Sequence, residues 1–145
     1  MNLSGKTTVS TKASSINRAL DEIGDKWCLL ILQEVFWGIN TFNEMLAGTG
    51  ASRGVLSNRL SWLESMGYLR KDIIAKGQKR PTYHMTKKSI ELYRNGLMAM
   101  TWERKYFTTP ALDSVELIHD RCGKAFWPMM ECSHCNQSVL STDVS

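Results

Sequence analysis

Apolar residues recur at helical spacing in the first part of this 145-residue chain. The first such set, at positions i, i+3, i+4 and i+7, consists of Ile16, Ala19, Leu20 and Ile23. This spacing predicts an amphipathic helix that begins near Ser15 and ends at Gly24. The next segment, 25–37, is apolar nearly all round, which predicts a helix in the middle of a core.

Two shorter helices are predicted next. The pattern Thr41-x-x-Glu44 is typical of a capping box and opens a third helix. Ser52 is a suitable N-cap for a fourth helix, which ends at Gly67 because glycine tolerates the left-handed conformation that closes many helices. A glycine-containing turn joins the two helices, so the pair has the order of a helix-turn-helix.

A hairpin and a long helix complete the pattern. Leu69–Ile74 and Thr82–Met85 are strand candidates on either side of a basic tip, residues 76–81, that contains Gly and Pro. Thr86 can cap a helix that reaches about Phe107. The order helix, helix, helix-turn-helix, hairpin, helix predicts a winged helix-turn-helix, mainly α with a small β wing.

The fourth predicted helix has a polar face of small side chains. Its inner arc contains Leu56, Leu60 and Leu63, and the opposite arc consists of Arg53, Gly54, Ser57, Asn58, Ser61 and Ser65. Small side chains let a helix approach base edges, and Ser, Asn and Arg can bond to bases or phosphates. A merely solvated face would normally carry more Glu and Lys, so DNA contact is the favoured interpretation. Arg59 borders the inner arc, so it could bind phosphate or pair structurally, with Glu44 as a candidate partner.

Basic charge is concentrated around the predicted hairpin. A single acid, Asp72, accompanies Arg70, Lys71, Lys76, Lys79, Arg80, Lys87 and Lys88. Basic side chains on a hairpin can neutralise phosphates or enter the minor groove. An ordinary solvated turn is the alternative, but this density beside a polar helix favours a DNA-binding wing.

Composition adds few constraints. The net charge of +4 and the hydrophobic content of 43% fit a globular domain that tolerates an anionic partner. Residues 1–14 are rich in Ser, Thr and Lys and predict a flexible leader with no signal peptide, so a cytoplasmic protein without a membrane partner is expected. No nucleophile–base pair, phosphate-binding glycine loop or open metal site is recognisable, so an enzyme is not expected.

Five fragments carry a family resemblance. In uninterrupted order, INRALDEIGDKW, LLIL, TFNEM, VLSNRLSWLESMGYL and RPTYHMT closely resemble the HxlR-type branch of winged-helix regulators, which is related to MarR-type proteins. The resemblance covers about residues 15–107 and implies a homodimeric transcription factor, by family habit a repressor, on a near-palindromic duplex operator. It places DNA contacts at Ser52, Arg53, Ser57, Asn58 and Arg59, and on the wing around Lys79 and Arg80. The basic charge of the wing adds Lys76 as a further candidate DNA contact.

One feature of the family is missing from the sequence. Several members sense oxidants or electrophiles through a cysteine just before the first helix, where this chain has Ser14. A hydroxyl does not form a thiolate at neutral pH, so this thiol switch is not expected. Cys28 lies in the second predicted helix and is interpreted as a small core residue rather than a sensor.

The long last helix predicts dimerisation. It has two apolar stripes, one of Ile90, Tyr93, Leu97 and Met100 and the other of Leu92, Ala99, Trp102 and Tyr106. One stripe can close the domain's core, and a partner helix would cover the second. Coverage by the C-terminal tail is the alternative. The same interface could hold an unknown apolar effector among Met98, Met100 and Trp102.

Residues 111–145 form a tail with paired metal-ligand residues. His119-x2-Cys122 and Cys132-x2-Cys135 are separated by nine residues, a spacing typical of a structural zinc site. Free thiols in a disordered tail and a disulfide remain alternatives. His134 lies inside the second pair and is not expected to be a ligand.

Two interpretations of function remain from the sequence. The favoured one is a sequence-specific regulator that binds double-stranded DNA as a homodimer. The other is a winged helix that serves only as a protein-interaction module, which would leave the basic wing and the polar helix face without a purpose. Salt-sensitive DNA binding distinguishes the two.

Overall fold

The structure is a computed structural model that describes residues 14–73, 80–107 and 116–144. Ile74, Lys76, Lys79, Pro110 and the predicted leader up to residue 13 lie outside the described residues. The chain divides into a unit of residues 9–96, here called the helix-turn-helix unit, and a second unit that contains residues 97–145. Among the described helices, none has the length and apolar character needed to cross a membrane.

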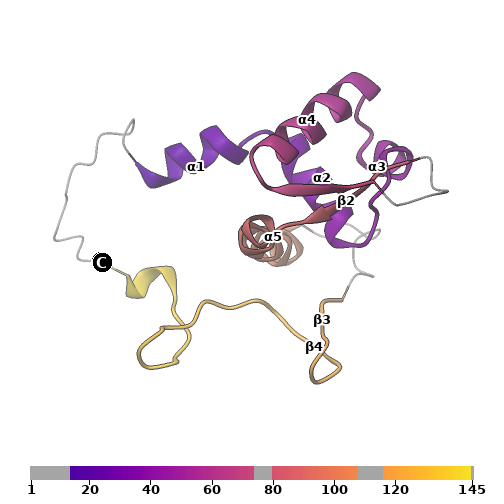
Figure 1. The fold of residues 1–145 in the computed structure, drawn as a ribbon. Helices are drawn as coiled ribbons and strands as arrows, with labels where there is room; N and C mark the ends of the chain where they lie inside the picture. Colours follow the sequence, from indigo (N-terminus) through magenta and orange to yellow (C-terminus); the bar gives the residue numbers. More distant parts are fainter. Residues whose placement is uncertain (1–13, 74–79, 108–115, 145) are drawn as a thin grey trace. The chain divides into compact units, whose positions relative to one another are not determined.

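Five helices and a two-stranded antiparallel sheet make up the described part of residues 14–107 (Figure 1). Their bounds are α1 Ser15–Ile23, α2 Lys26–Phe36, α3 Phe42–Thr49, α4 Arg53–Ser65, β1 Leu69–Asp72, β2 Thr82–Met85 and α5 Lys87–Tyr106. Element order and type agree with the sequence prediction, so the mainly α winged helix-turn-helix is confirmed.

The core lies around α2. Cys28, Ile31, Leu32 and Val35 on this helix are buried, and α2 contacts α3, α4 and β2. From the other elements, Met45, Leu56, Leu60, Leu63 and Tyr93 are buried. Leu56, Leu60 and Leu63 recur at i, i+4 and i+7, the period that places side chains on one face of a helix. Burial of this face leaves the opposite face of α4 exposed to solvent.

Side-chain caps fix where the helices begin. Ser14, Asp25 and Ser52 accept hydrogen bonds from backbone N–H groups of Asn17, Trp27 and Val55, which start α1, α2 and α4. The capping box predicted for α3 is wrong in detail, because the Thr41 hydroxyl donates to the Glu44 carboxylate and makes no cap bond to the backbone.

The wing is a short antiparallel pair whose register matches Leu69 with Met85 and Asp72 with Thr82. Strand β1 ends at Asp72, before the predicted end at Ile74. Thr41 forms a bridge to Thr82, and the Tyr83 N–H donates to the Asn40 carbonyl over 2.9 Å. The chain before α3 therefore extends the pairing of β2 and ties the base of the wing to the helix-turn-helix.

The tail has little regular structure. Ile118–His119 (β3) and Lys124–Ala125 (β4) form a small antiparallel hairpin, and Ser141–Asp143 form a 3-10 helix. Leu117 is the buried apolar residue of its described part. Residues 126–130 have neither helix nor strand assignment.

Candidate nucleic-acid interface

The predicted polar face of α4 is exposed. Its members are Arg53, Gly54, Ser57, Asn58, Ser61 and Ser65. The one acidic residue of α4, Glu64, lies in its last turn, away from the N-terminal end. In a helix-turn-helix, the N-terminal residues of the second helix contact base edges. The N-terminal half of this face offers Arg, Ser and Asn, which can bond to bases and phosphates.

A hollow of about 370 Å³ joins the start of α4 to the base of the wing. It is lined by Thr41, Phe42, Asn43, Arg53, Arg80 and Pro81. The Arg53 guanidinium lies 5.9 Å from the centre of the Phe42 ring, which supports its position beside the helix. The structure thus brings together two predicted DNA-binding arginines, Arg53 and Arg80, that are far apart in sequence. Two guanidinium groups at one hollow form a suitable site for a phosphate.

Asn43 is a candidate that sequence reasoning missed. It is an exposed residue of α3 at the edge of this hollow. Its amide can donate a hydrogen bond to phosphate or base. The helical pattern of α3 indicates that position 43 faces outward, but only the pairing of residues 40–41 with β2 places it near Arg80.

Arg59 has a structural partner. It forms an ion pair with Asp25, the N-cap residue of α2. The predicted pairing with Glu44 is wrong, because Glu44 bonds to Thr41 instead. The Arg59 guanidinium therefore pairs within the chain, and this ion pair links α4 to the start of α2.

Basic residues around the wing differ in whether their charged groups already bond to other groups of the chain. Arg70 makes two 2.9 Å hydrogen bonds to Asp72, and these lower the pKa of that carboxyl group. Lys88 donates to the Met66 carbonyl over 2.9 Å and lies 3.9 Å from the centre of the Tyr68 ring. Both cations thus have intramolecular partners, whereas Arg80 is exposed at the hollow. Lys76 and Lys79 lie outside the described residues.

Two apolar helix surfaces are exposed. On α1, which has no buried residue, Ile16 is 74% and Leu20 is 58% exposed. On α5, Trp102 and Tyr106 of the second predicted stripe are exposed, while Tyr93 of the first stripe is buried. Ile90 of the first stripe is 51% exposed, so the predicted division into a buried and an exposed stripe agrees with the structure at Tyr93, Trp102 and Tyr106 but is wrong at Ile90.

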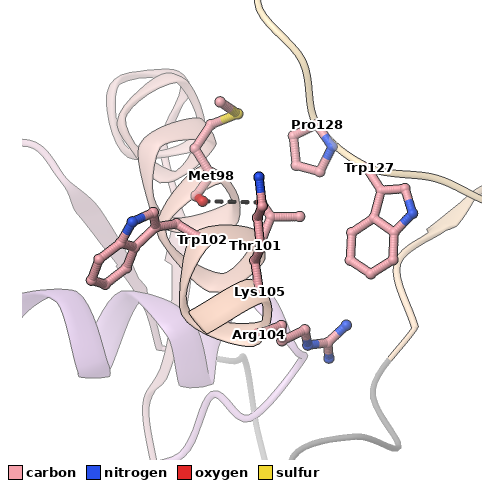
Figure 2. A pocket seen from close by; sticks show the side chains of 7 residues that line it. All are labelled: Met98, Thr101, Trp102, Arg104, Lys105, Trp127 and Pro128. Carbon is pink, nitrogen blue, oxygen red and sulfur yellow. Dashed lines mark hydrogen bonds between the residues drawn. The ribbon is translucent and has the colours of Figure 1, made fainter. Parts of the chain in front are cut away.

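An open apolar groove of about 580 Å³ lies within the second unit. Figure 2 shows the side chains that line it, which are Met98, Thr101, Trp102, Arg104, Lys105, Trp127 and Pro128. Two residues of the suggested effector site, Met98 and Trp102, line this groove, and Met100 is not among its lining residues.

Ser14 and Cys28, the two positions discussed above for a thiol switch, both have structural roles. Ser14 caps α1 through a 3.0 Å bond from the Asn17 N–H. Cys28 is 2% exposed, and its pKa is raised by burial and by the nearby charge of Asp25, with Arg59 opposing. A buried thiol with a raised pKa is a poor nucleophile, in agreement with its interpretation as a core residue.

The predicted metal ligands are brought together as two pairs. His119 Nδ1 lies 3.3 Å from Cys122 Sγ. Cys132 lies beside Cys135, and the backbone N–H groups of Cys135 and His134 lower the pKa of the Cys132 thiol. Within the residues described, no three His, Cys, Asp or Glu side chains form a group that could hold a metal ion. All four cysteines are free thiols.

The element order and the exposed polar face of α4 define a winged helix-turn-helix protein. Residues 22–110 match the HxlR-like helix-turn-helix family, and the chain belongs to that family. The HxlR resemblance drawn from the sequence is therefore confirmed.

Two further comparisons agree with this assignment. The chain is 29% identical over 134 residues to an uncharacterized HTH-type transcriptional regulator of Mycobacterium tuberculosis, covering 92% of this chain and 85% of that protein. The crystal structure of PA1607, named as a candidate transcription factor, has a TM-score of 0.77 at 25% identity and covers 94% of this chain and 97% of its own.

A protein from Enterococcus faecalis V583 that is described as a candidate transcriptional regulator of the MarR family is also similar in structure. It has a TM-score of 0.56 at 27% identity and covers 71% of this chain and 93% of its own. The relation to MarR-type proteins noted in the sequence is therefore also found in the fold.

Proposed function

We propose that this regulator binds a specific duplex DNA site with α4 in the major groove and the wing on the backbone or in the minor groove. The observation that carries the proposal is the exposed polar face of α4, which begins at the hollow shared by Arg53 and Arg80. Ser57 and Asn58 would contact base edges, and Arg53 and Arg80 would bind phosphate. Lys76 and Lys79 of the wing would add phosphate contacts, and the regulator would act as a repressor.

Arg59 would not contact DNA in this proposal. Its ion pair with Asp25 supports a structural role. Ser52 would act mainly as the helix cap that orients the first turn of α4, because its hydroxyl already accepts from the Val55 N–H over 3.2 Å.

The protein would act as a homodimer. The exposed apolar faces of α1 and α5 support this, because a second copy would remove Ile16, Leu20, Trp102 and Tyr106 from water. A two-fold dimer would also match a near-palindromic operator.

DNA binding is tested first with fragmented source-genome DNA across a salt series. The wild-type protein should enrich a few fragments, with an affinity that falls steeply as salt rises. An Arg53→Ala, Ser57→Ala, Asn58→Ala variant should lose those fragments by more than about 10-fold, because each good base contact contributes about 1–3 kcal/mol. Arg94→Ala, which removes an exposed arginine of α5, is the matched control and should retain binding.

Two results would contradict the proposed DNA-binding surface. If wild-type protein enriches no fragment at low salt, or if the triple variant binds as well as Arg94→Ala does, the recognition surface is assigned wrongly. The winged helix would then be a protein-interaction module. Repression is tested separately, by placing an enriched fragment before a reporter gene and comparing expression with and without the regulator.

Dimerisation is tested by light scattering after size-exclusion chromatography. Leu20→Asp and Trp102→Asp should each shift the wild-type dimer toward monomer, because each would bury a charge in the proposed interface. Ile73→Asp changes an isoleucine that is 81% exposed outside both helices and should leave the mass unchanged. A wild-type monomer at micromolar concentration would refute this part of the proposal.

A further inference from the structure

The two ligand pairs of the tail lie in turns of the same kind. In the first, the His119 carbonyl accepts hydrogen bonds from the N–H groups of Cys122 and Gly123, over 3.1 and 2.7 Å. Gly123 follows the second ligand with a φ of +68°. Strands β3 and β4 enclose this turn and hold His119 Nδ1 3.3 Å from Cys122 Sγ. We call this turn the first knuckle.

Residues 132–136 repeat this local geometry and are called the second knuckle. The Cys132 carbonyl accepts from the Asn136 N–H over 2.9 Å. Asn136 follows the second ligand with a φ of 56°, and it is the one non-glycine residue with positive φ in the part of the chain that is described. A bridge between Glu131 and Ser138 encloses the turn, as β3 and β4 enclose the first.

The two turns share their backbone geometry. In each, the carbonyl of the first ligand accepts the N–H of the residue four positions later, and that residue has a positive φ, Gly123 in the first turn and Asn136 in the second. Each turn therefore presents two potential ligands three positions apart, as one half of a tetrahedral site does.

In the described part of the tail, Leu117 is the one buried apolar residue, which is too little burial to explain the folded turns. Trp127, Met129 and Met130 are 63%, 76% and 47% exposed. Short segments of this kind commonly depend on a metal ion to fold. Ion binding would supply the stabilisation that burial does not.

We propose that one zinc ion joins the two knuckles through His119, Cys122, Cys132 and Cys135 of the same chain. Three sulfur ligands and one imidazole in a tetrahedral set are typical of structural zinc. No three of these ligands form one group in the described residues, so ion binding would bring the two knuckles together and close residues 123–131 into a loop. This nine-residue connector keeps the second knuckle at a high effective concentration near the first, which favours closure within one chain.

Cobalt substitution tests the site in the full-length protein under reducing conditions. The chain should bind one equivalent of Co²⁺, give the intense visible bands of tetrahedral cobalt with thiolate charge-transfer bands, and release the ion when Zn²⁺ is added. His119→Ala and Cys135→Ser should each weaken binding by at least about 100-fold. His134→Ala and Cys28→Ala remove a neighbouring imidazole and a buried thiol, and both should keep the wild-type spectrum.

A mixing experiment tests whether one chain supplies all four ligands. One variant carries His119→Ala and Cys122→Ser, and the other carries Cys132→Ser and Cys135→Ser. Neither variant, alone or mixed, should show the tetrahedral spectrum. Tetrahedral binding that returns on mixing would overturn closure within one chain. Wild-type protein that binds no cobalt, or binds it only with the weak bands of six-coordinate cobalt, would overturn the site altogether.

Discussion

The helix-turn-helix unit and the tail use apolar side chains in opposite ways. All buried apolar residues from Cys28 to Tyr93 lie in the helix-turn-helix unit, and Leu117 alone represents the described tail. The tail instead exposes large side chains such as Trp127 and Met129. Buried apolar side chains stabilise the first region, whereas the second region consists largely of polar turns that contain His and Cys residues. The chain therefore combines a region that apolar burial can stabilise with one in which the described residues bury little apolar surface.

The largest expected effect follows directly from this contrast. Leu56 is fully buried, and Leu140 in the tail is 65% exposed. Leu56→Ala should lower the free energy of unfolding by about 2–5 kcal/mol, because it leaves a cavity in the core. Leu140→Ala should change it by less than about 0.5 kcal/mol. Denaturant unfolding followed by far-UV circular dichroism measures both, and equal losses would contradict the division of the chain.

The sequence predicted the helix-turn-helix unit well for the same physical reason. A buried helix face repeats its apolar residues at helical spacing, as Leu56, Leu60 and Leu63 do, and caps such as Ser52 mark the helix ends. In this region the spacing of apolar residues along the sequence therefore identifies the residues that are buried in the fold.

Relations between distant segments were harder to predict. The partner of Arg59 is Asp25, 34 positions earlier, and neither residue has a periodic pattern that reveals the pairing. The hollow shared by Arg53 and Arg80 likewise depends on the pairing of residues 40–41 with β2. The tail's ligand spacing predicted two pairs, but spacing alone does not show how the connector between them folds.

The second prediction concerns Arg59, at the boundary between the fold and the DNA-binding surface. Its side chain is 39% exposed and that of Asp25 is 30% exposed. Arg59→Gln should lower the free energy of unfolding by about 1 kcal/mol, a modest value because solvent screens the pair.

DNA binding distinguishes the roles of Arg59. The slope of log affinity against log salt for an enriched fragment should stay unchanged in Arg59→Gln, whereas loss of one phosphate contact would reduce it by about 1. An unchanged stability with a reduced slope would place Arg59 on the DNA instead of in the fold.

The third prediction concerns a charge beside the core. Burial raises the pKa of Glu34, whose Oε2 has no hydrogen-bond partner among the described residues. A carboxyl group with a raised pKa in the folded state binds its proton more readily there than in the unfolded chain. Its contribution to stability is therefore full below the unfolded pKa and is lost as pH rises through the folded pKa.

Glu34→Gln should therefore stabilise the protein at pH 7, by less than about 1 kcal/mol. Between about pH 4.5 and neutral pH, the free energy of unfolding should also fall less in the variant than in the wild type. Chemical denaturation at several pH values measures both effects, with Glu116→Gln, an exposed acid of the tail, as the control. A destabilised variant at pH 7 would show that the carboxylate makes a favourable contact instead.

The smallest effect is expected at α1, a helix without a buried residue. Its start depends on the Ser14 hydroxyl, which accepts the Asn17 N–H over 3.0 Å. Ser14→Ala should reduce protection of the α1 amides against hydrogen exchange by about 0.5–1 kcal/mol, the usual contribution of such a cap. Ser15→Ala, one residue later, should not.

If α1 lies in the proposed dimer interface, its protection should also rise with protein concentration, because association adds the burial that a single chain lacks. Protection that depends on Ser14 but not on concentration would mean that α1 is held by its cap alone and is not covered by a second copy.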